Sequence, residues 1–115
     1  MVNITKYMKK ENSLKEIQQI VNDWIKDHGG YWSPLSMTCA IMEELGEVAR
    51  EIKSLEGYKP KKSNKLNLNL GEELADLLFS VVCIANHYNV DLGKEFNKTL
   101  DKYSKRDSIR CLNLK

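Results

Sequence analysis

Cysteine is scarce in this chain and gives no sign of a covalent or metal framework. The 115 residues include three cysteines, Cys39, Cys83 and Cys111. The number is odd, the spacing is wide and no CxxC pair occurs, so neither a disulfide framework nor a zinc site is predicted. Cys39 and Cys83 lie within apolar helical patterns, where we expect both to be small buried hydrophobic residues.

Long apolar runs and a large charge imbalance are also missing. No apolar run approaches the length that spans a bilayer, and the first residues, MVNITKYMKK, lack the apolar stretch of a signal peptide. We therefore expect a cytoplasmic protein that does not enter membranes. The 18 basic and 16 acidic residues give a net charge of only +2. This balance argues against nucleic-acid binding through a broad basic surface.

Aliphatic residues at helical spacing are what the chain has in quantity. Hydrophobic residues make up 42% of the chain and aromatic residues 8%, which suits a soluble domain with a core of Leu, Ile, Val and Met. The length suits one domain, so we expect residues 1–115 to form a single domain whose core spans about 14–106. The apolar pattern predicts four helices, an all-α fold and a helix bundle.

The first two predicted helices have clear start and stop signals. Ser13 and Glu16 form a capping box before a helix that ends at the glycine pair 29–30. Ser33, followed by proline, begins the second helix, and Gly57 closes it. The second helix has one apolar stripe, formed by Ile41, Leu45, Val48, Ile52 and Leu55.

The second half of the chain begins with a polar segment. Residues 58–69 contain a proline, four lysines and three asparagines, which predicts a long loop. The third helix, predicted at about 70–88, is the most apolar, so we expect it to be buried centrally or at an oligomer interface. Asn89 ends this helix and Asp91 caps the fourth. The polar tail after Arg106 is predicted to fray.

Two pairs of acidic residues, each three residues apart, mark the second and third helices. They are Glu44 with Glu47, and Glu73 with Asp76. Side chains three apart are neighbours on a helix surface. Glu44 lies roughly 60° and Glu47 roughly 120° from the centre of the apolar stripe, on the same side. If the two helices pack antiparallel through their stripes, the two pairs meet at one border of the contact.

Four crowded carboxylates indicate a divalent cation. Their repulsion is tolerable only with bound cations or raised pKa values. An all-oxygen ligand set suits Mg²⁺, with Mn²⁺ as a substitute, and does not suit zinc. Because Mg²⁺ shares its coordination shell with substrate phosphates, the cluster favours phosphoryl chemistry. From spacing alone, a pair of solvated acidic surfaces is the alternative.

The order of the acids resembles a known signature. The motif EELGE at 43–47, then a gap of 25 residues, then ELAD at 73–76, is similar to the E-E-x-x-E … E-x-x-D pattern of the MazG-type all-α nucleotide pyrophosphohydrolases. Beyond the acids, MEELGEVAREI (42–52) and LGEELADLLFSVVCIAN (70–86) look like that family. The strings GYWSPLSM (30–37) and KYSKRD (102–107) look like its short single-domain, YpjD-like branch.

The resemblance implies an enzyme that hydrolyses a nucleoside triphosphate to the monophosphate and pyrophosphate, with removal of aberrant or surplus nucleotides as its task. It implies that Glu44, Glu47, Glu73 and Asp76 hold Mg²⁺. Glu43 matches the first acid of the motif but points away from the apolar stripe, so it is a water-orienting base or a solvated acid. Glu47 is the other candidate catalytic residue, and the motif leaves open which group activates the water.

Candidate substrate-binding residues lie outside the acidic pairs. Lys102 and Arg106 share a helix face and are candidates for phosphate contact, the alternative being an exposed basic helix end. Longer family members have an asparagine where this chain has Leu100, which leaves the sugar contact open. Trp32 is a candidate for stacking on a base, or a hydrophobic lid over the helix start. Lys59, with the other loop lysines, is a candidate triphosphate clamp or a solvated residue.

Two alternative functions remain open at this point. One is phosphoribosyl-ATP pyrophosphohydrolase, which shares the helical scaffold, and the other is a non-enzymatic metal-binding or helical interaction module. A di-iron carboxylate bundle is set aside, because its Glu-x-x-His pairs are absent. The apolar third helix and the resemblance both indicate a homo-oligomer, either a dimer or a tetramer.

Overall fold

The structure, a computed structural model, describes residues 11–57 and 69–114, with side chains as far as residue 107. Its helices are α1 (Leu14–Asp27), α2 (Pro34–Leu55), α3 (Asn69–His87) and α4 (Leu92–Leu114). These ranges contain no strand, so the all-α prediction is confirmed. The predicted 58–69 loop lies outside them, apart from Asn69, the first residue of α3. Among the described helices, none combines the length and the apolar character needed to cross a membrane.

Local capping signals set the starts of α1 and α2. The Ser13 hydroxyl oxygen accepts a hydrogen bond from the Glu16 N–H at 3.2 Å, and the Glu16 carboxylate accepts one from the Ser13 N–H at 3.2 Å. This is the predicted capping box. Ser33 caps α2 through its own hydroxyl oxygen. Between the two helices, Gly29 and Gly30 have φ angles of 102° and 91°, a left-handed conformation that residues with a side chain rarely adopt.

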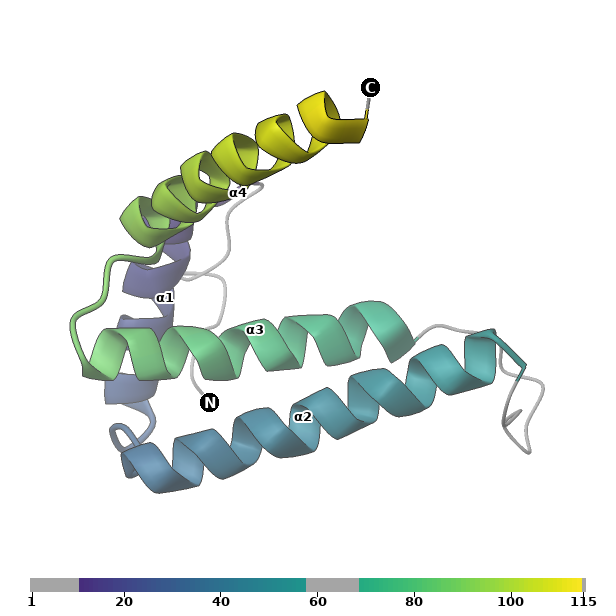
Figure 1. The fold of residues 1–115 in the computed structure, drawn as a ribbon. Coiled ribbons are helices and arrows are strands. Elements are labelled where there is room, and N and C mark those ends of the chain that lie inside the picture. Colours follow the sequence, from purple (N-terminus) through teal and green to yellow (C-terminus); the bar gives the residue numbers. More distant parts are fainter. Residues whose placement is uncertain (1–10, 58–68, 115) are drawn as a thin grey trace.

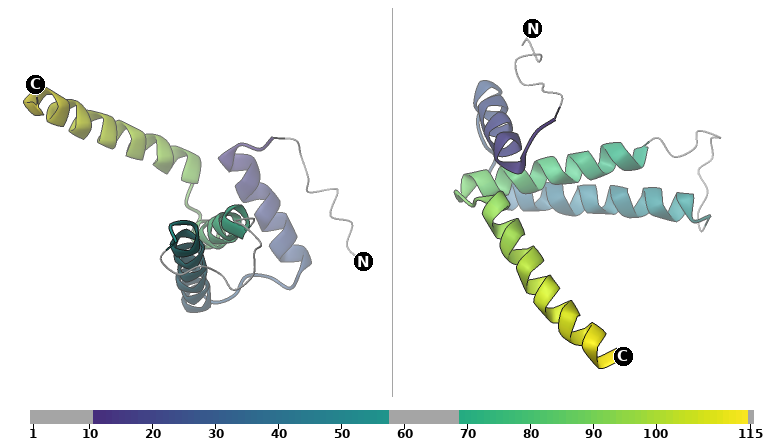
Figure 2. Two further views of the ribbon diagram at one scale, coloured as in Figure 1. Left: turned by 90° about the vertical axis from the view of Figure 1, so that its right-hand side faces the viewer. Right: turned by 90° about the horizontal axis from the view of Figure 1, so that it is seen from above.

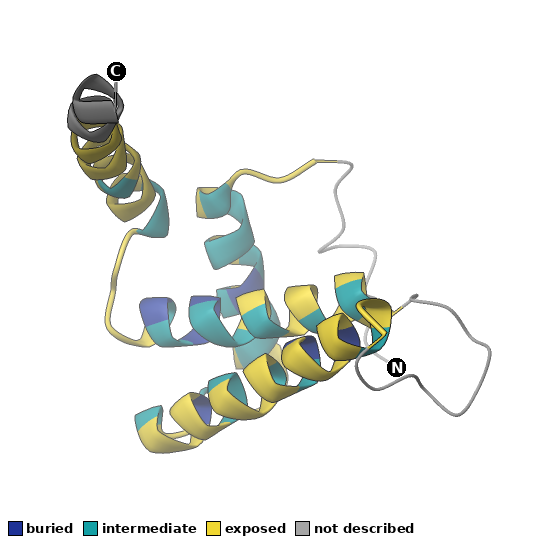
Figure 3. Cartoon of the chain, turned by 45° about the vertical axis from the view of Figure 1, so that its right-hand side comes forward, coloured by how far each residue is buried: buried dark blue, intermediate teal, exposed yellow. Residues whose placement is uncertain are grey.

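The helices α2 and α3 run antiparallel as a hairpin, and α1 crosses α3 near its C-terminal end (Figure 1). Val21, Met37, Val82 and Cys83 are buried at this crossing and form a small core. Figure 3 shows how few positions outside this crossing and the inner side of α2 are buried. Cys83 is buried as predicted. The prediction for Cys39 is wrong: it is exposed, on the opposite side of α2 from Met37.

The apolar stripe of α2 is only partly covered: Val48, at its centre, is buried, but three other members are exposed. Leu45, Ile52 and Leu55 are 55%, 46% and 45% exposed. The covered positions in this part of α2 are Val48 of the stripe together with Glu44, Glu47 and Glu51 to one side of it. The predicted packing through the apolar stripes, with the acids at the border, is therefore corrected. The acids lie on the covered face, because an amphipathic pattern does not reveal which neighbour covers each side of a helix.

The turn after α3 and the path of α4 are only partly as predicted. Asn89 ends α3 as expected, with a left-handed φ of 56°. Asp91 caps α4, and its carboxylate accepts a hydrogen bond from the Lys94 N–H at 3.1 Å. The predicted fraying after Arg106 is wrong, since α4 continues to Leu114. The rest of this helix contains no glycine or proline that would interrupt it.

The helix α4 diverges from the hairpin (Figure 2), and its main packing partner is α1. A set of hydrogen bonds, here called the Gln18 clamp, joins α1 to the α3–α4 turn. The Gln18 side-chain amide donates to Asn86 Oδ1 at 3.0 Å and to the Val90 carbonyl at 2.8 Å, and it accepts from the Leu92 N–H at 3.0 Å. Asn86 donates in return to the Gln18 carbonyl at 2.9 Å. The clamp fixes where α4 begins.

Candidate metal centre

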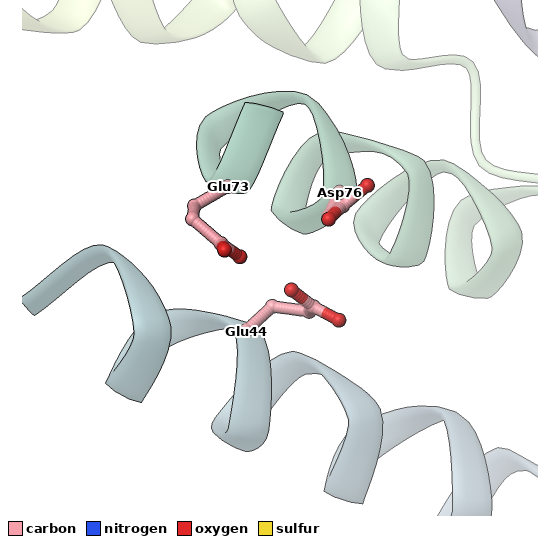
Figure 4. A group of neighbouring side chains, drawn as sticks. All are labelled: Glu44, Glu73 and Asp76. Carbon is pink, nitrogen blue, oxygen red and sulfur yellow. The ribbon is translucent and has the colours of Figure 1, made fainter. Parts of the chain in front are cut away.

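Three carboxylates from the two hairpin helices meet between α2 and α3 (Figure 4). One oxygen from each of Glu44, Glu73 and Asp76 lies within 4.8 Å of the other two. Glu73 and Asp76 are one turn apart on α3, and the antiparallel α2 places Glu44 opposite them. Glu44 and Glu73 are half-buried while Asp76 is exposed, so the cluster opens to solvent beside Asp76. The structure thus brings together three of the four predicted ligands.

Glu73 has the most acidic surroundings of the three. Loss of solvent raises the pKa of its carboxyl above the ordinary value, and the charges of Glu47, Glu44, Asp76 and Glu72 raise the pKa further. The ionised form of Glu73 is therefore disfavoured, first by loss of solvent and then by the neighbouring carboxylates. A cation placed among these oxygens would reverse this effect, because it favours the ionised carboxylates.

Glu47, the fourth predicted ligand, is turned toward Arg50. The Arg50 guanidinium donates a hydrogen bond to a Glu47 carboxylate oxygen and forms an ion pair with it. This contact raises the pKa of the Arg50 guanidinium. Glu47 is still close enough to raise the pKa of Glu73, so it lies at the edge of the cluster. Sequence reasoning missed Arg50, although its position three residues after Glu47 was the available signal.

Two other acids on α2 lie in contrasting environments. Glu43 is exposed, as expected from its angle around the helix, and does not join the cluster. Glu51 was not singled out from the sequence, yet it is only 4% exposed and is the one buried charged residue in the described part of the chain. Position 51 is seven residues, two helical turns, after Glu44 on the same face of α2. The seven-residue spacing from Glu44 is the sequence signal that could have identified Glu51.

The donor set of the cluster fits a small divalent cation. Carboxylate oxygens are the ligands that Mg²⁺ and Mn²⁺ prefer, and the cluster contains neither the histidine nor the cysteine typical of zinc sites. Oxygens bound to one Mg²⁺ lie about 3–4 Å apart. The observed limit of 4.8 Å is slightly wider, so small side-chain rotations close the gap. Three protein ligands leave coordination positions for water and phosphate oxygens.

The predicted basic residues are not brought to the cluster. Lys102 and Arg106 lie on α4, which diverges from the hairpin (Figure 2). The Lys102 ammonium and the Arg106 guanidinium lie 5.0 Å and 4.6 Å from the centroid of the Tyr103 ring. Arg106 also pairs with Asp107 at 3.4 Å. Lys59 lies outside the described residues.

An aromatic cleft of about 310 Å³ opens between α1, the start of α2 and α3. Phe79, one turn after Asp76 on α3, forms part of its wall. Trp24 stacks on His28 with ring centroids 3.9 Å apart and meets Phe79 edge-on at 5.7 Å. Trp32 also lines the cleft and is 69% exposed, so its ring is accessible from solvent. The cleft therefore offers aromatic surface within a short distance of the carboxylates.

Comparison with known proteins shows which family the chain belongs to. Residues 32–110 match the MazG nucleotide pyrophosphohydrolase domain. The chain belongs to the MazG family. This MazG chain is 38% identical over 101 residues to the uncharacterized protein YpjD of Bacillus subtilis (strain 168), covering 87% of this chain and 91% of YpjD.

Two solved structures resemble this MazG chain. The crystal structure of YPJD from Bacillus subtilis has a TM-score of 0.74 and 36% identity, covering 83% of this chain and 98% of that one. The crystal structure of a Bacillus-conserved MazG protein, a nucleotide pyrophosphohydrolase, has a TM-score of 0.69 and 33% identity. The match covers 83% of this chain and 93% of that one. The comparisons confirm the expected family, its short YpjD-like branch and its enzyme class, nucleotide pyrophosphohydrolase. MazG enzymes generally depend on divalent metals, and the carboxylate cluster supplies suitable ligands.

Proposed function

We propose that this MazG chain is a Mg²⁺-dependent nucleoside triphosphate pyrophosphohydrolase. It converts a (d)NTP and water to the (d)NMP and pyrophosphate, and its task is to remove aberrant or surplus nucleotides. The observation that supports this best is the gathering of Glu44, Glu73 and Asp76 between two helices. In the reaction, the water oxygen bonds to the α-phosphorus, the bond from that phosphorus to the bridging oxygen breaks, and pyrophosphate leaves.

The residues of the cluster have separate roles in this proposal. A Mg²⁺ ion bound there would neutralise phosphate charge and would lower the pKa of coordinated water. Glu44, Glu73 and Asp76 hold the ion between α2 and α3. Glu47 is the candidate acceptor of the water proton, because it lies at the edge of the cluster and its Arg50 partner can hold the carboxylate in place. Glu43, on the exposed side of α2, is the second candidate for that role.

The aromatic cleft is the proposed site for the nucleobase. Phe79 lies one turn from Asp76, so a nucleotide with its phosphates at the cluster can direct its base into the cleft. Stacking of a base on an aromatic ring contributes about 1–3 kcal/mol. We expect Trp32→Ala to raise KM with little change in kcat, because stacking on the base is equally strong in ground and transition states. An unchanged KM for every substrate would exclude Trp32 from base binding.

Pyrophosphate release is the measurement that tests the proposed function. Purified protein is incubated with Mg²⁺ and a panel of (d)NTPs, with phosphoribosyl-ATP included. Glu44→Gln and Asp76→Asn are expected to lower kcat/KM by about 100-fold or more, because each removes a ligand of the ion. Glu72→Gln, an exposed acid of α3 outside the cluster, is the matched control and keeps wild-type activity.

Two results would contradict this proposal and favour an alternative. Mg²⁺ binding measured by calorimetry, without pyrophosphate release from any nucleotide, would indicate a metal-binding module. Pyrophosphate release from phosphoribosyl-ATP alone would indicate that the protein is a phosphoribosyl-ATP pyrophosphohydrolase.

A further inference from the structure

His28 follows the last residue of α1, and a hydrogen bond holds its ring against the helix. Its Nδ1 lies 2.7 Å from the Trp24 carbonyl oxygen, one turn earlier in the chain. A carbonyl oxygen only accepts hydrogen bonds, so Nδ1 carries the proton and is the donor. In a neutral imidazole the second ring nitrogen then has a free lone pair. Nε2 of His28 is therefore a hydrogen-bond acceptor.

Two aromatic contacts fix the plane of the same ring. The imidazole stacks on the Trp24 indole, with ring centroids 3.9 Å apart and an angle of 15° between the planes. The Trp24 indole meets the Phe79 ring of α3 edge-on, with centroids 5.7 Å apart. The position of Nε2 is thus set before a ligand binds, so little side-chain freedom is lost when it accepts a hydrogen bond.

The aromatic cleft has His28 in its lining, and Nε2 is the acceptor that the side chains of the cleft leave available. In the described part of the chain, no hydrogen bond to this nitrogen is formed. The indole N–H groups of Trp24 and Trp32 can only donate. The Tyr31 hydroxyl is already used, since it donates to Asn22 Oδ1 at 2.8 Å. A ligand that stacks in the cleft therefore gains a hydrogen bond at Nε2 if it carries a donor there.

The order of the rings places His28 at the end of the cleft away from the carboxylates. Phe79 lies one turn after Asp76 on α3. Trp24 contacts Phe79, and His28 stacks on Trp24. A nucleotide with its phosphates at the cluster therefore directs toward His28 the end of its base opposite the sugar. In cytosine and adenine this end has an amino group, and in uracil, thymine and guanine it has a carbonyl oxygen.

We propose that His28 is a specificity-determining residue that selects bases with an amino group at this end. The amino group donates a hydrogen bond to Nε2, whereas a carbonyl oxygen faces the lone pair with no proton between them. Nucleotides of cytosine and adenine are then hydrolysed in preference to those of uracil, thymine and guanine. The inference rests on the proposed function, since His28 contacts the base of the nucleotide held at the cluster.

Pairs of nucleotides that differ at this one group test the selection. Pyrophosphate release is compared for dCTP with dUTP, and for dATP with dITP, in which an oxygen replaces the amino group. A mildly alkaline buffer keeps imidazole neutral. We expect kcat/KM to be about tenfold higher for the amino member of each pair, because one hydrogen bond between neutral groups is gained at a site open to solvent.

Two substitutions at His28 separate the acceptor from the ring. His28→Phe retains an aromatic ring beside Trp24 and removes Nε2, so kcat/KM for the amino nucleotides should fall about tenfold, to the level of the keto ones. His28→Gln can present either an oxygen or an NH₂ group near the position of Nε2, so it should hydrolyse both members of a pair equally well. His87→Phe is the matched control: His87 contacts Tyr31 outside the cleft lining and should not affect the preference.

The outcomes distinguish this inference from the proposed function. Equal kcat/KM for both members of a pair in the wild type would overturn the selection by His28 and leave the proposed function standing. A preference that survives in His28→Phe or in His28→Gln would overturn it as well, because another group would then read the base. Absence of pyrophosphate release from every nucleotide would instead refute the proposed function.

Nitrogen NMR of His28 gives a test that does not depend on turnover. The ¹⁵N spectrum of the wild type should show a protonated Nδ1 and an unprotonated Nε2. In the presence of Mg²⁺, addition of dCMP should shift the Nε2 resonance, and addition of dUMP at the same concentration should not. A ring protonated at Nε2 alone, or equal responses to the two monophosphates, would overturn the proposal.

Discussion

The carboxyl of Glu73 links the geometry of the cluster to protein stability. Its pKa is raised from the ordinary value of 4.5, first by loss of solvent and then by the charges of Glu47 and Glu44. A group with a raised pKa binds its proton more tightly in the folded state than in the unfolded state. Its contribution to stability is therefore greatest at low pH and is lost as pH rises from 4.5 through the raised pKa. Ionised Glu73 destabilises the metal-free protein at neutral pH.

We expect Glu73→Gln to flatten the pH dependence of stability in a chelating buffer. The free energy of unfolding, measured by urea denaturation from about pH 4.5 to about pH 7, should decline less in the variant than in the wild type. At neutral pH the variant should be at least as stable as the wild type. Glu72→Gln, which removes a more distant charge, is the control. A variant less stable at every pH would show that Glu73 has a structural role.

Single residues with local roles were predictable, and those with roles set by packing were not. The Ser13 cap and the Asn89 helix end depend on neighbours within a few positions, and both are where the sequence predicted them. The gathering of Glu73 and Asp76 also follows from helical spacing. Cys39 is exposed because it lies on the opposite side of α2 from the core residue Met37, and its flanking sequence does not specify which side of the helix is covered.

Between elements, the Gln18 clamp is the joint that sets the direction of α4. Asn86→Ala is expected to lower the free energy of unfolding by about 1–3 kcal/mol, because it removes two partly buried hydrogen bonds between α1 and α3. Urea denaturation measures this loss. Gln19→Ala is the matched control on the same helix: its amide donates to Asp23 in an exposed pair worth less than about 0.5 kcal/mol. Equal losses in the two variants would show that the clamp adds no stability.

The four helices could be placed from the sequence, apart from the C-terminal end of α4, but their packing could not. The apolar stripe of α2 indicated a buried face, yet Leu45 and Ile52 are exposed in the chain and Glu51 is buried. Periodicity shows which side of a helix favours burial, but it does not show which neighbouring helix covers each side. The helix α3 was expected to lie centrally or at an oligomer interface, and its apolar residues differ in burial along the helix. Val82 is fully buried, and Leu74 is 47% exposed.

For the whole molecule, we expect the cluster to couple ion binding to folding. A ligand that binds only the folded state stabilises it by about 2.7 kcal/mol when its concentration is 100 times its Kd. Thermal denaturation in saturating Mg²⁺ and in a chelator should therefore show a higher Tm with the ion. Asp76→Asn should abolish the shift, and Glu72→Gln should retain it. An equal shift in Asp76→Asn would place the stabilising ion elsewhere.

The split of the ligands between two helices has a consequence for how long the enzyme survives. Glu44 and Glu73 are 29 residues apart in the chain, so an ion held by both acts as a reversible cross-link that closes a long loop. With the proposed ion at this site, the protein would lose this tether together with its turnover when free divalent cation is scarce. An idle copy would then also be the one most readily opened and degraded, so the supply of the ion would govern enzyme abundance as well as rate.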